Sequence, residues 1–335
     1  MHQIASALPD YEASFSPYYA DSFLDTFRRA GLLEWTILGN KSIARTTSYL
    51  RDHGLTIDPQ GQLHDYDLVV TCQDLIVPKN IRRNKIVLVQ EGMTDAERIM
   101  YHVVRSVRFV PRWLGGTAAT GLSDLYDRFC VASEGYRELF IHKGVQPGKI
   151  EVTGIPNFDN CRKYLSNNFP HKHFVLACTS DSRETFVYEN RKKFIRNAIR
   201  IAGGPQLIFK LHPNENVDRA TKEINRFAPG AIVYADGKAE EMVANCDVLI
   251  TRFSSTAFVG LALGKEVHSD FDLGQLRRLL PLQNNSAAAK IAGVCRKLIE
   301  QENGATELLR HRRTEALHVS KVFQTTARSV MTETE

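Results

Sequence analysis

The chain has 335 residues, 43% of them apolar and 24% charged, values that are typical of globular proteins and exclude a disordered chain. This length is enough for two domains, each with its own hydrophobic core. The 43 lysines and arginines exceed the 38 acidic residues, and the net charge of +5 suits an anionic small molecule or a membrane surface. The sequence carries no RNA- or DNA-binding signature, so no nucleic-acid partner is predicted.

Cysteine usage and the lack of long apolar segments predict a protein of the cytoplasm. No two cysteines have the CxxC spacing, so free thiols in a reducing compartment are expected. The sequence has no apolar stretch of about 18 residues and no signal peptide, which favours the cytoplasm or, peripherally, the inner face of the cell membrane. His171 and His173 have no further ligand cluster beside them, so no metal site is predicted. The cysteines are Cys72, Cys130, Cys161, Cys178, Cys246 and Cys295.

The first predicted domain spans residues 1–160 and begins unusually. A doubly wound domain opens with a strand and a glycine-containing turn, but here helices at 1–8 and 20–30 precede the first strand. We therefore expect that the first strand is missing, that the native start lies upstream of Met1, and that the sheet has a gap. Strands are predicted at 34–39, 67–71, 85–90, 129–132 and 149–152, and further helices at 42–53, 95–108 and 133–142.

The strand at 85–90 delivers a carboxylate to the edge of the predicted sheet. Glu91 follows this strand directly and precedes a glycine. A carboxylate in this position, facing a ligand cleft, can deprotonate an acceptor hydroxyl, so Glu91 is a candidate catalytic base. The alternative is that Glu91 only caps the following helix. The residues predicted to line the acceptor side of the cleft are Gln90, Gly92, Met93 and Thr94.

Basic and apolar residues alternate shortly after this site. Arg105, Arg108 and Arg112 are interleaved with valines, a phenylalanine, Trp113 and Leu114. That composition is expected where a peripheral enzyme touches an anionic lipid surface, and ordinary packing is the alternative. The small residues at 115–121 predict a loop that closes on a substrate or a plain connector.

A Thr-Gly-Ile-Pro turn at 153–156 marks the predicted domain boundary, and the polar residues 160–172 form the predicted linker. The second domain, residues 173–285, opens with a strand that is followed by hydroxyl and guanidinium groups. Such groups at a strand end can bind phosphate or ribose, and they can equally cap the next helix. The residues are Thr179, Ser180 and Arg183.

Two later strands of the second domain are each followed by a polar turn. Serines and threonines at a helix start favour a bound phosphate, because free N–H groups and the helix dipole attract anions. Ligands bind outside the carboxyl ends of parallel strands, and we expect these two strands to be neighbours, so one pocket for a nucleotide's phosphates is predicted. A simple turn and a simple cap are the alternatives. The strand at 206–211 leads to His212, Pro213 and Asn214, and the strand at 247–251 leads to Ser254, Ser255 and Thr256.

The end of the chain, residues 286–335, is predicted to be helical. A last strand at 266–268 closes the second sheet, and helices follow at 285–302 and 305–329. We expect the last helix to cross back and brace the first domain.

The turns of the second domain carry a resemblance to a known family. Phe209-Lys210-Leu211-His212-Pro213, the run at 246–251 with Ser254-Ser255, and the run at 262–267 resemble the carboxyl-terminal domain of GT-B glycosyltransferases. The likeness covers the chain from Tyr66 onward. It is nearest to bacterial capsule and wall-polymer transferases, namely CMP-Kdo and polysialic acid transferases and CDP-glycerol glycerophosphotransferases. It implies an α/β fold with two doubly wound Rossmann-like domains that face a cleft.

The resemblance also implies a reaction. In the Kdo and sialyl groups, an acid-acid-Gly motif supplies the base; Glu91 matches it, and Gln90 departs from it. The Trp-His-Gly base of the glycerophosphotransferases is absent. No Asp-x-Asp arrangement is suited to hold a divalent ion at a diphosphate, so the implied activity is a metal-independent, inverting sugar transfer without a cofactor, in which His212 stabilises the leaving group. The implied donor is a nucleotide-sugar, CMP-linked or UDP-linked, and the acceptor is a glycan or a lipid-linked chain.

Three other functions stay open. A UDP-N-acetylglucosamine 2-epimerase shares the fold and the His-Pro turn, and would need further carboxylates in the cleft, for which Asp95 and Glu134 are candidates. A glycerophosphotransferase of the CDP-glycerol type is the second. The third is a protein that binds a nucleotide without chemistry.

Overall fold

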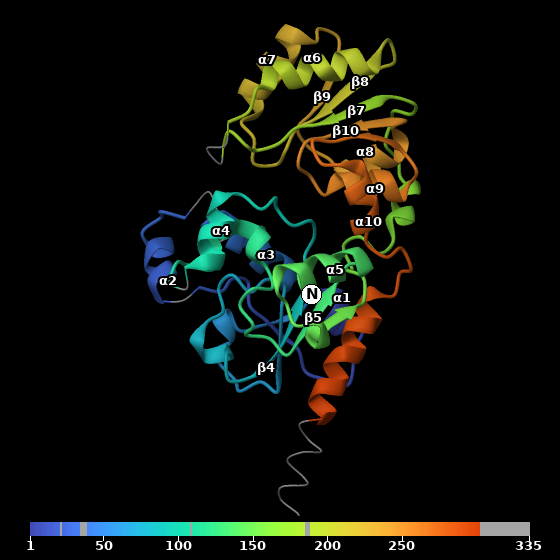
Figure 1. Cartoon of the computed structure of the whole chain (residues 1–335). Coiled ribbons are helices and arrows are strands. Elements are labelled where there is room, and N and C mark those ends of the chain that lie inside the picture. Colours follow the sequence, from blue (N-terminus) through green and yellow to red (C-terminus); the bar gives the residue numbers. More distant parts are fainter. Residues whose placement is uncertain (21, 34–38, 108, 185–187, 302–335) are drawn as a thin grey trace, which may run out of the picture.

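The computed structural model describes residues 1–20, 22–33, 39–107, 109–184 and 188–301. Two parallel β-sheets, each accompanied by helices, form the two parts of the molecule (Figure 1). A core of buried side chains runs from one part into the other. Phe129 and Phe140 of the first part belong to the same apolar cluster as Leu176 and Phe258 of the second.

The N-terminal sheet has four parallel strands that pair in the order of the chain. Each of its two central strands begins with a half-buried basic residue and is otherwise apolar and buried, as expected for a sheet that is covered on both faces. In the described residues, each strand of this sheet pairs with the next one along the chain, and the sheet has no gap. The strand predicted at 34–39 lies outside the described residues, except for Gly39. The strands are β3 (Leu68–Thr71), β4 (Lys85–Val89), β5 (Arg128–Val131) and β6 (Ile150–Val152).

The other elements of this domain surround the sheet. A small parallel pair, β1 with β2, forms a separate sheet. α5 begins at a serine cap, where Ser133 Oγ accepts a hydrogen bond from the Tyr136 N–H, and it ends at Gly144 with a φ of +103°. The elements are α1 (His2–Ser6), β1 (Ser14–Phe15), α2 (Ser22–Arg29), α3 (Asn40–Asp52), β2 (Thr56–Ile57), η1 (Pro59–Gly61), η2 (Lys79–Ile81), α4 (Ile99–Ser106), η3 (Arg112–Ala119), α5 (Glu134–Lys143) and η4 (Pro147–Lys149).

The C-terminal sheet has five parallel strands in the order β11-β10-β7-β8-β9. The chain winds outward from β7 in both directions, which confirms a doubly wound sheet. α6 and α7 cover one face, and α8 and α9 cover the face toward the N-terminal domain (Figure 1). The elements are η5 (Cys161–Leu165), β7 (Val175–Cys178), α6 (Arg191–Ala202), β8 (Leu207–Lys210), α7 (Val217–Phe227), β9 (Ile232–Tyr234), α8 (Ala239–Asn245), β10 (Val248–Ile250), α9 (Thr256–Ala262), β11 (Glu266–His268) and α10 (Leu273–Leu279).

This strand order corrects one prediction. His212 follows β8 and Ser254 follows β10, but β7 lies between these two strands. Adjacent strands are about 4.8 Å apart, so the two turns begin roughly 10 Å from each other. The prediction that they sit on neighbouring strand ends was wrong.

The domains meet where α5 packs against α10, a helix that was not predicted from the sequence. Ser133 Oγ donates a hydrogen bond to the Leu279 carbonyl at 3.2 Å, and the Leu282 N–H donates to the Ala132 carbonyl at 3.0 Å. The helix at 287–301 then returns to the N-terminal domain, beside α1 and β5 (Figure 1). Its buried residues Ile291 and Cys295 pack in one apolar cluster with Ile4 and Val87. The helix predicted at 305–329, which we expected to make this contact, lies outside the described residues.

Gly135 allows the close approach of α5 to α10. A Cβ added at this position would lie 2.1 Å from the carbonyl oxygen of Arg278, a backbone atom that cannot move away alone. We expect Gly135→Ala to lower the free energy of unfolding by about 1–3 kcal/mol, as overpacking does. Denaturant unfolding measures the change.

Gly293→Ala is the matched control for this prediction. Gly293 also lies within a helix, but nothing is within 4 Å of an added Cβ. The control is expected to be stabilised by up to about 1 kcal/mol, because alanine is the better helix former. Equal stability of the two variants would show that the domain contact does not require a glycine.

Candidate functional site

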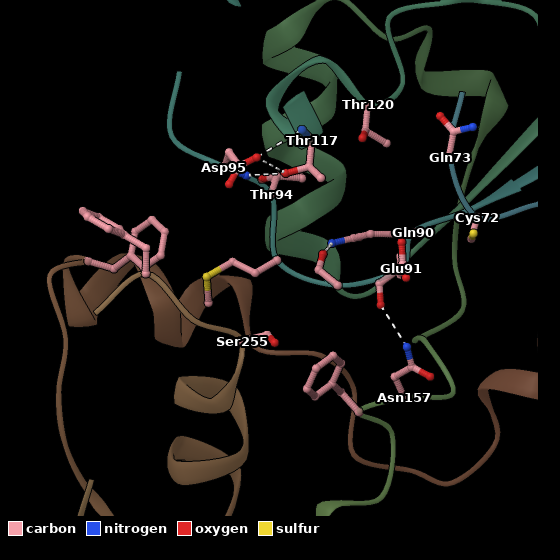
Figure 2. A pocket seen from close by; sticks show the side chains of 15 residues that line it. Cys72, Gln73, Gln90, Glu91, Thr94, Asp95, Thr117, Thr120, Asn157 and Ser255 are labelled. Atoms are coloured by element: carbon pink, nitrogen blue, oxygen red, sulfur yellow. Dashed lines mark hydrogen bonds between the residues drawn. The ribbon is translucent and has the colours of Figure 1, made fainter. Parts of the chain in front are cut away.

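A pocket of about 340 Å³ lies between the two domains. The wall formed by the N-terminal domain includes the residues that follow β3 and β4, together with the end of η3. The C-terminal wall of the pocket consists of residues that follow β10 and β11. Figure 2 shows Glu91 and Asn157 on one side and Ser255 on the other. The lining residues are Cys72, Gln73, Gln90, Glu91, Gly92, Met93, Thr94, Asp95, Thr117, Thr120, Asn157, Phe158, Phe253, Ser255 and Phe271.

Two carboxylates line this pocket, those of Glu91 and Asp95. In the described residues, only the Glu91 carboxylate makes no hydrogen bond to a neighbouring loop. The Glu91 backbone carbonyl accepts a hydrogen bond from Asn157 Nδ2 at 3.2 Å, which fixes the loop after β4 to the domain crossover. The side chain reaches water on one side, and the pocket walls remove enough solvent to raise the pKa of the Glu91 carboxyl above its ordinary value. Such a carboxylate is a better proton acceptor near neutral pH.

Gln90 holds the ends of two strands together. Its Oε1 accepts a hydrogen bond from the Ala132 N–H at 2.9 Å, and its Nε2 donates to the Gly92 carbonyl at 2.7 Å. The side chain is buried, at 2% exposure. A carboxylate here would lack the donor that satisfies the Gly92 carbonyl, so an amide suits this position. Gln90 therefore shapes the turn that presents Glu91.

Asp95 lines the pocket but is bound to the opposite loop. Its Oδ2 accepts hydrogen bonds from the Thr117 hydroxyl at 2.7 Å and the Thr117 N–H at 3.1 Å, and its own N–H donates to the Thr117 hydroxyl at 2.8 Å. Because this contact holds residue 95 outside a helix, α4 begins at Ile99, later than predicted. Glu134, the other candidate acid of an epimerase, does not line the pocket and lies 3.7 Å from Arg137.

The glycine-rich segment at 115–121 is packed. It belongs mainly to η3, in which Ala118 and Ala119 are fully buried. Lys143 Nζ, itself buried, donates a hydrogen bond to the Ala118 carbonyl at 2.9 Å. The segment thus supplies a wall of the pocket through Thr117 and Thr120, and most of it forms a 3-10 helix.

The turn after β10 places Ser255 in the pocket. Ser254 Oγ accepts hydrogen bonds from the Thr256 N–H at 3.3 Å and the Thr256 hydroxyl at 3.0 Å, while the Ser255 side chain makes no capping bond. Phe253 and Phe271 complete this wall as an edge-to-face pair with ring centroids 4.8 Å apart. Phe253 remains 47% exposed, so its ring can stack on a ligand.

His212 does not line the pocket. Its Nδ1 accepts a hydrogen bond from the Asn214 N–H at 3.3 Å and lies 3.6 Å from an oxygen of Asp181. The Asn214 side chain donates to the same carboxylate at 3.1 Å. The imidazole thus belongs to a polar group at the end of β8, apart from Glu91 and Ser255.

The other predicted phosphate ligands are engaged within the fold. Thr179 Oγ1 donates to the buried Glu215 carboxylate and accepts a hydrogen bond from the His212 N–H at 3.1 Å. Ser180 Oγ donates to Glu189 at 3.1 Å. Arg183 makes two parallel bonds to Glu223, at 2.9 and 2.6 Å. These side chains hold the loop after β7 in place.

Several pocket residues were not predicted. Gln73 and Cys72 follow β3, so the rule that ligands bind at strand ends could have found them. Burial raises the pKa of the Cys72 thiol to about 11, so it stays protonated at neutral pH. Phe271 follows β11, so the same rule places it at the cleft. Phe253 gave no signal, because nothing in the sequence separates an exposed phenylalanine from a core one.

Two kinds of feature are absent from the described residues, namely a metal-binding cluster and a membrane-spanning helix. No group of three or more histidine, cysteine, aspartate or glutamate side chains is placed to hold a metal ion. Among the helices of the described ranges, none has the length and apolar character needed to cross a bilayer. All six cysteines are free thiols.

No family model and no curated protein matches the chain. Several solved structures are similar to it at low identity. UDP-GlcNAc 2-epimerase from Methanocaldococcus jannaschii, in complex with UDP-GlcNAc and UDP, is 12% identical; the match covers 76% of this chain and 79% of that one, with a TM-score of 0.46. The wall teichoic acid polymerase TagF is 12% identical over 74% and 78% of the two chains, with a TM-score of 0.45. HepE from Anabaena, in complex with UDP and glucose, is 14% identical over 75% and 79%, with a TM-score of 0.43.

The class of fold follows from the chain's own topology. Two Rossmann-like α/β domains with parallel sheets face each other across a pocket, which is the GT-B arrangement. The expected fold class is therefore confirmed. Similarities at this identity describe the fold alone, so the chemistry of the pocket has to be argued from its own residues.

Proposed function

We propose that this protein is a metal-independent, inverting glycosyltransferase that moves a sugar from a nucleotide-activated donor to a glycan or lipid-linked acceptor. The observation that supports this most is the position of Glu91, a carboxylate with a raised pKa in a pocket between two Rossmann-like domains. A base on one wall and a donor site on the other is what a transfer between two substrates requires.

In this reaction, the Glu91 carboxylate takes the proton of the acceptor hydroxyl. The acceptor oxygen then forms a bond to the anomeric carbon of the donor sugar while the bond from that carbon to the phosphate oxygen breaks. The electron pair leaves with the nucleotide, so configuration inverts. We propose that the C-terminal wall holds the donor, with the Ser255 hydroxyl toward the phosphate and the Phe253 ring against the base or the sugar.

We assign no step to His212, because its imidazole does not line the pocket. The N-terminus of α9 also offers fewer free N–H groups for binding a phosphate than predicted. Its Thr256, Ala257 and Phe258 N–H groups already bond to Ser254 and Ser255, which leaves the Ser255 hydroxyl as the group that a phosphate can meet. A CMP-linked donor is favoured by the resemblance of the turns, and a UDP-linked donor is the alternative. We place the enzyme in the cytoplasm, at the inner face of the cell membrane.

A thermal-shift series with CMP, CDP, UMP and UDP tests the donor site. A ligand that binds only the native state at about 100 times its Kd adds about 2.7 kcal/mol, which raises Tm by several degrees. We expect CMP or CDP to give the largest shift, and Ser255→Ala to reduce it. Ser42→Ala, an exposed serine of α3, is the control and should leave the shift unchanged. No shift with any of the four nucleotides would contradict the proposal.

A further inference from the structure

The segment at 98–114, which we call the α4–η3 surface, exposes an unusual number of large apolar side chains. Among the described residues, it carries five of the fifteen large hydrophobic residues that are exposed. Ile99 is 81% exposed and Phe109 is 89% exposed, so neither packs in the fold. Exposed apolar side chains at this density in one short segment indicate an interaction site. The five residues are Ile99, Met100, Phe109, Trp113 and Leu114.

The underside of this surface is well packed, so its exposed residues are not a core left open. Tyr101 and Val104 of α4 form a buried cluster with Ala118 and Ala119 of η3. Lys143 closes this cluster from α5, with its Nζ 2.9 Å from the Ala118 carbonyl and 3.6 Å from a Glu97 oxygen. The exposed side chains of this surface are therefore carried by a well-packed backbone.

The charges of the surface all have one sign. The sequence has no aspartate or glutamate from residue 98 to residue 123, while it has arginines at 98, 105, 108 and 112. In the part of the chain that the structure describes, none of Arg98, Arg105 and Arg112 lies within ion-pair distance of a carboxylate. The nearest acids in the sequence are already engaged, since Glu97 pairs with Lys143 and Asp95 binds Thr117. Arg98 and Arg105 are exposed and can therefore meet an anionic partner.

We propose that the α4–η3 surface docks on an anionic lipid bilayer. Tryptophan and phenylalanine side chains enter the headgroup region, and arginines beside them bind lipid phosphates; together they give interfacial binding. A bilayer offers a continuous apolar layer beneath its anionic phosphates, which suits side chains as exposed as Phe109 and Ile99.

Docking in this way would bring the pocket to the membrane. Thr94 and Asp95 precede the surface, Thr117 and Thr120 follow it, and all four line the pocket. α4 lies at the edge of the N-terminal domain that is turned toward the C-terminal domain (Figure 1). Resting on the proposed function, this position favours an acceptor that is anchored in the bilayer, with its hydroxyl delivered to Glu91.

Co-sedimentation of the full chain with vesicles tests the docking. We expect binding to phosphatidylcholine vesicles that contain phosphatidylglycerol, little binding to phosphatidylcholine alone, and weaker binding as salt rises. Phe109→Ser with Ile99→Ser should reduce the partition constant about tenfold or more, because buried apolar area is lost. Leu63→Ser is the control, since Leu63 is 65% exposed on the same domain but outside the surface.

A charge variant separates the arginines from the overall basicity of the chain. Arg98→Gln with Arg105→Gln should lower binding to the anionic vesicles by about fivefold for each charge. Arg51→Gln, an exposed arginine of α3, should leave binding nearly unchanged. Circular dichroism confirms that each variant is folded.

Two outcomes would overturn the inference. One is equal binding of the surface variants, the control variants and the original chain. The other is a chain that does not bind anionic vesicles but self-associates in analytical ultracentrifugation through the same residues, which would make the surface a contact between two copies. The assay contains no nucleotide or sugar, so its result is independent of the glycosyltransferase proposal.

Discussion

Replacing Arg191 by methionine is expected to lower the free energy of unfolding by about 3–5 kcal/mol, the usual cost of removing one partner from a buried ion pair. The Arg191 side chain is 4% exposed and lies between two carboxylates that are more deeply buried, Glu189 at 1% and Glu215 at 0%. Its Nε is 3.0 Å from Glu189, its Nη2 contacts Glu215, and Nη2 also donates to the Ser180 carbonyl at 3.1 Å. Methionine fills much of the same space but leaves two acids without their cation.

Denaturant unfolding of this variant should also depend on pH in a defined direction. Burial already raises the pKa of the Glu215 carboxyl, and loss of the arginine should raise it further. The folded variant then binds more protons than the unfolded chain above the ordinary glutamate pKa, so its stability falls as pH rises. The loss of unfolding free energy in Arg191→Met, relative to the original chain, should therefore be smaller near about pH 5 than near about pH 8.

Arg196→Met is the matched control for Arg191→Met. Arg196 lies on the same helix, α6, but is exposed, so its loss should change stability by less than about 0.5 kcal/mol. Adding Glu215→Gln to Arg191→Met should recover part of the loss, because one uncompensated charge is removed. Equal stability of Arg191→Met and Arg196→Met would show that the buried cluster does not depend on its cation.

Replacing Glu91 by glutamine is expected to lower kcat by about 10²–10⁴-fold, the usual contribution of a general base. Glutamine has nearly the same shape, and the fixed part of this turn is the Glu91 backbone, held by Asn157 at 3.2 Å. The thermal shift with nucleotide should therefore be retained. Release of free nucleotide, from the donor that the thermal-shift series selects and in the presence of acceptor, measures the rate.

The pH profile offers a second test of Glu91. Only the carboxylate can accept the proton, and its pKa is raised because the pocket walls remove part of its solvent. The rate should thus fall on acidification at a pH above the ordinary glutamate pKa of about 4.3. Glu134→Gln changes an exposed acid outside the pocket. This variant should leave unaltered both the rate and the pH at which the rate falls on acidification. Full activity of Glu91→Gln would remove the proposed base and the mechanism with it.

Local patterns were enough to predict part of the pocket wall that the N-terminal domain forms. An apolar run that stops at Glu91 places a carboxylate at a strand end, and a strand end of a parallel sheet faces the ligand crevice. The same reasoning identified the Ser255 turn, which lies across the pocket. Both results depend only on where a strand ends.

Other features depended on contacts that local patterns do not contain. α10 was missed because its sequence gives a weak helical signal; Asp272 caps it through a 2.7 Å bond to the Gln275 N–H, and its packing on α5 supports it. The segment at 115–121 reads as a flexible loop, yet the buried Lys143 fixes it. In both cases a partner distant in the sequence supplies the stabilising contact.

The sequence by itself determined the position of the strands and the residues that stand at their carboxyl ends, because hydrophobic period and capping act over a few residues. The tertiary structure alone decided which of those ends share a pocket. The order β10-β7-β8 inserts a strand between the turns of Ser254 and His212, and the docking of α10 on α5 brings Ser255 opposite Glu91. Strand order and domain contact arise from packing between distant segments, and no local pattern encodes that packing.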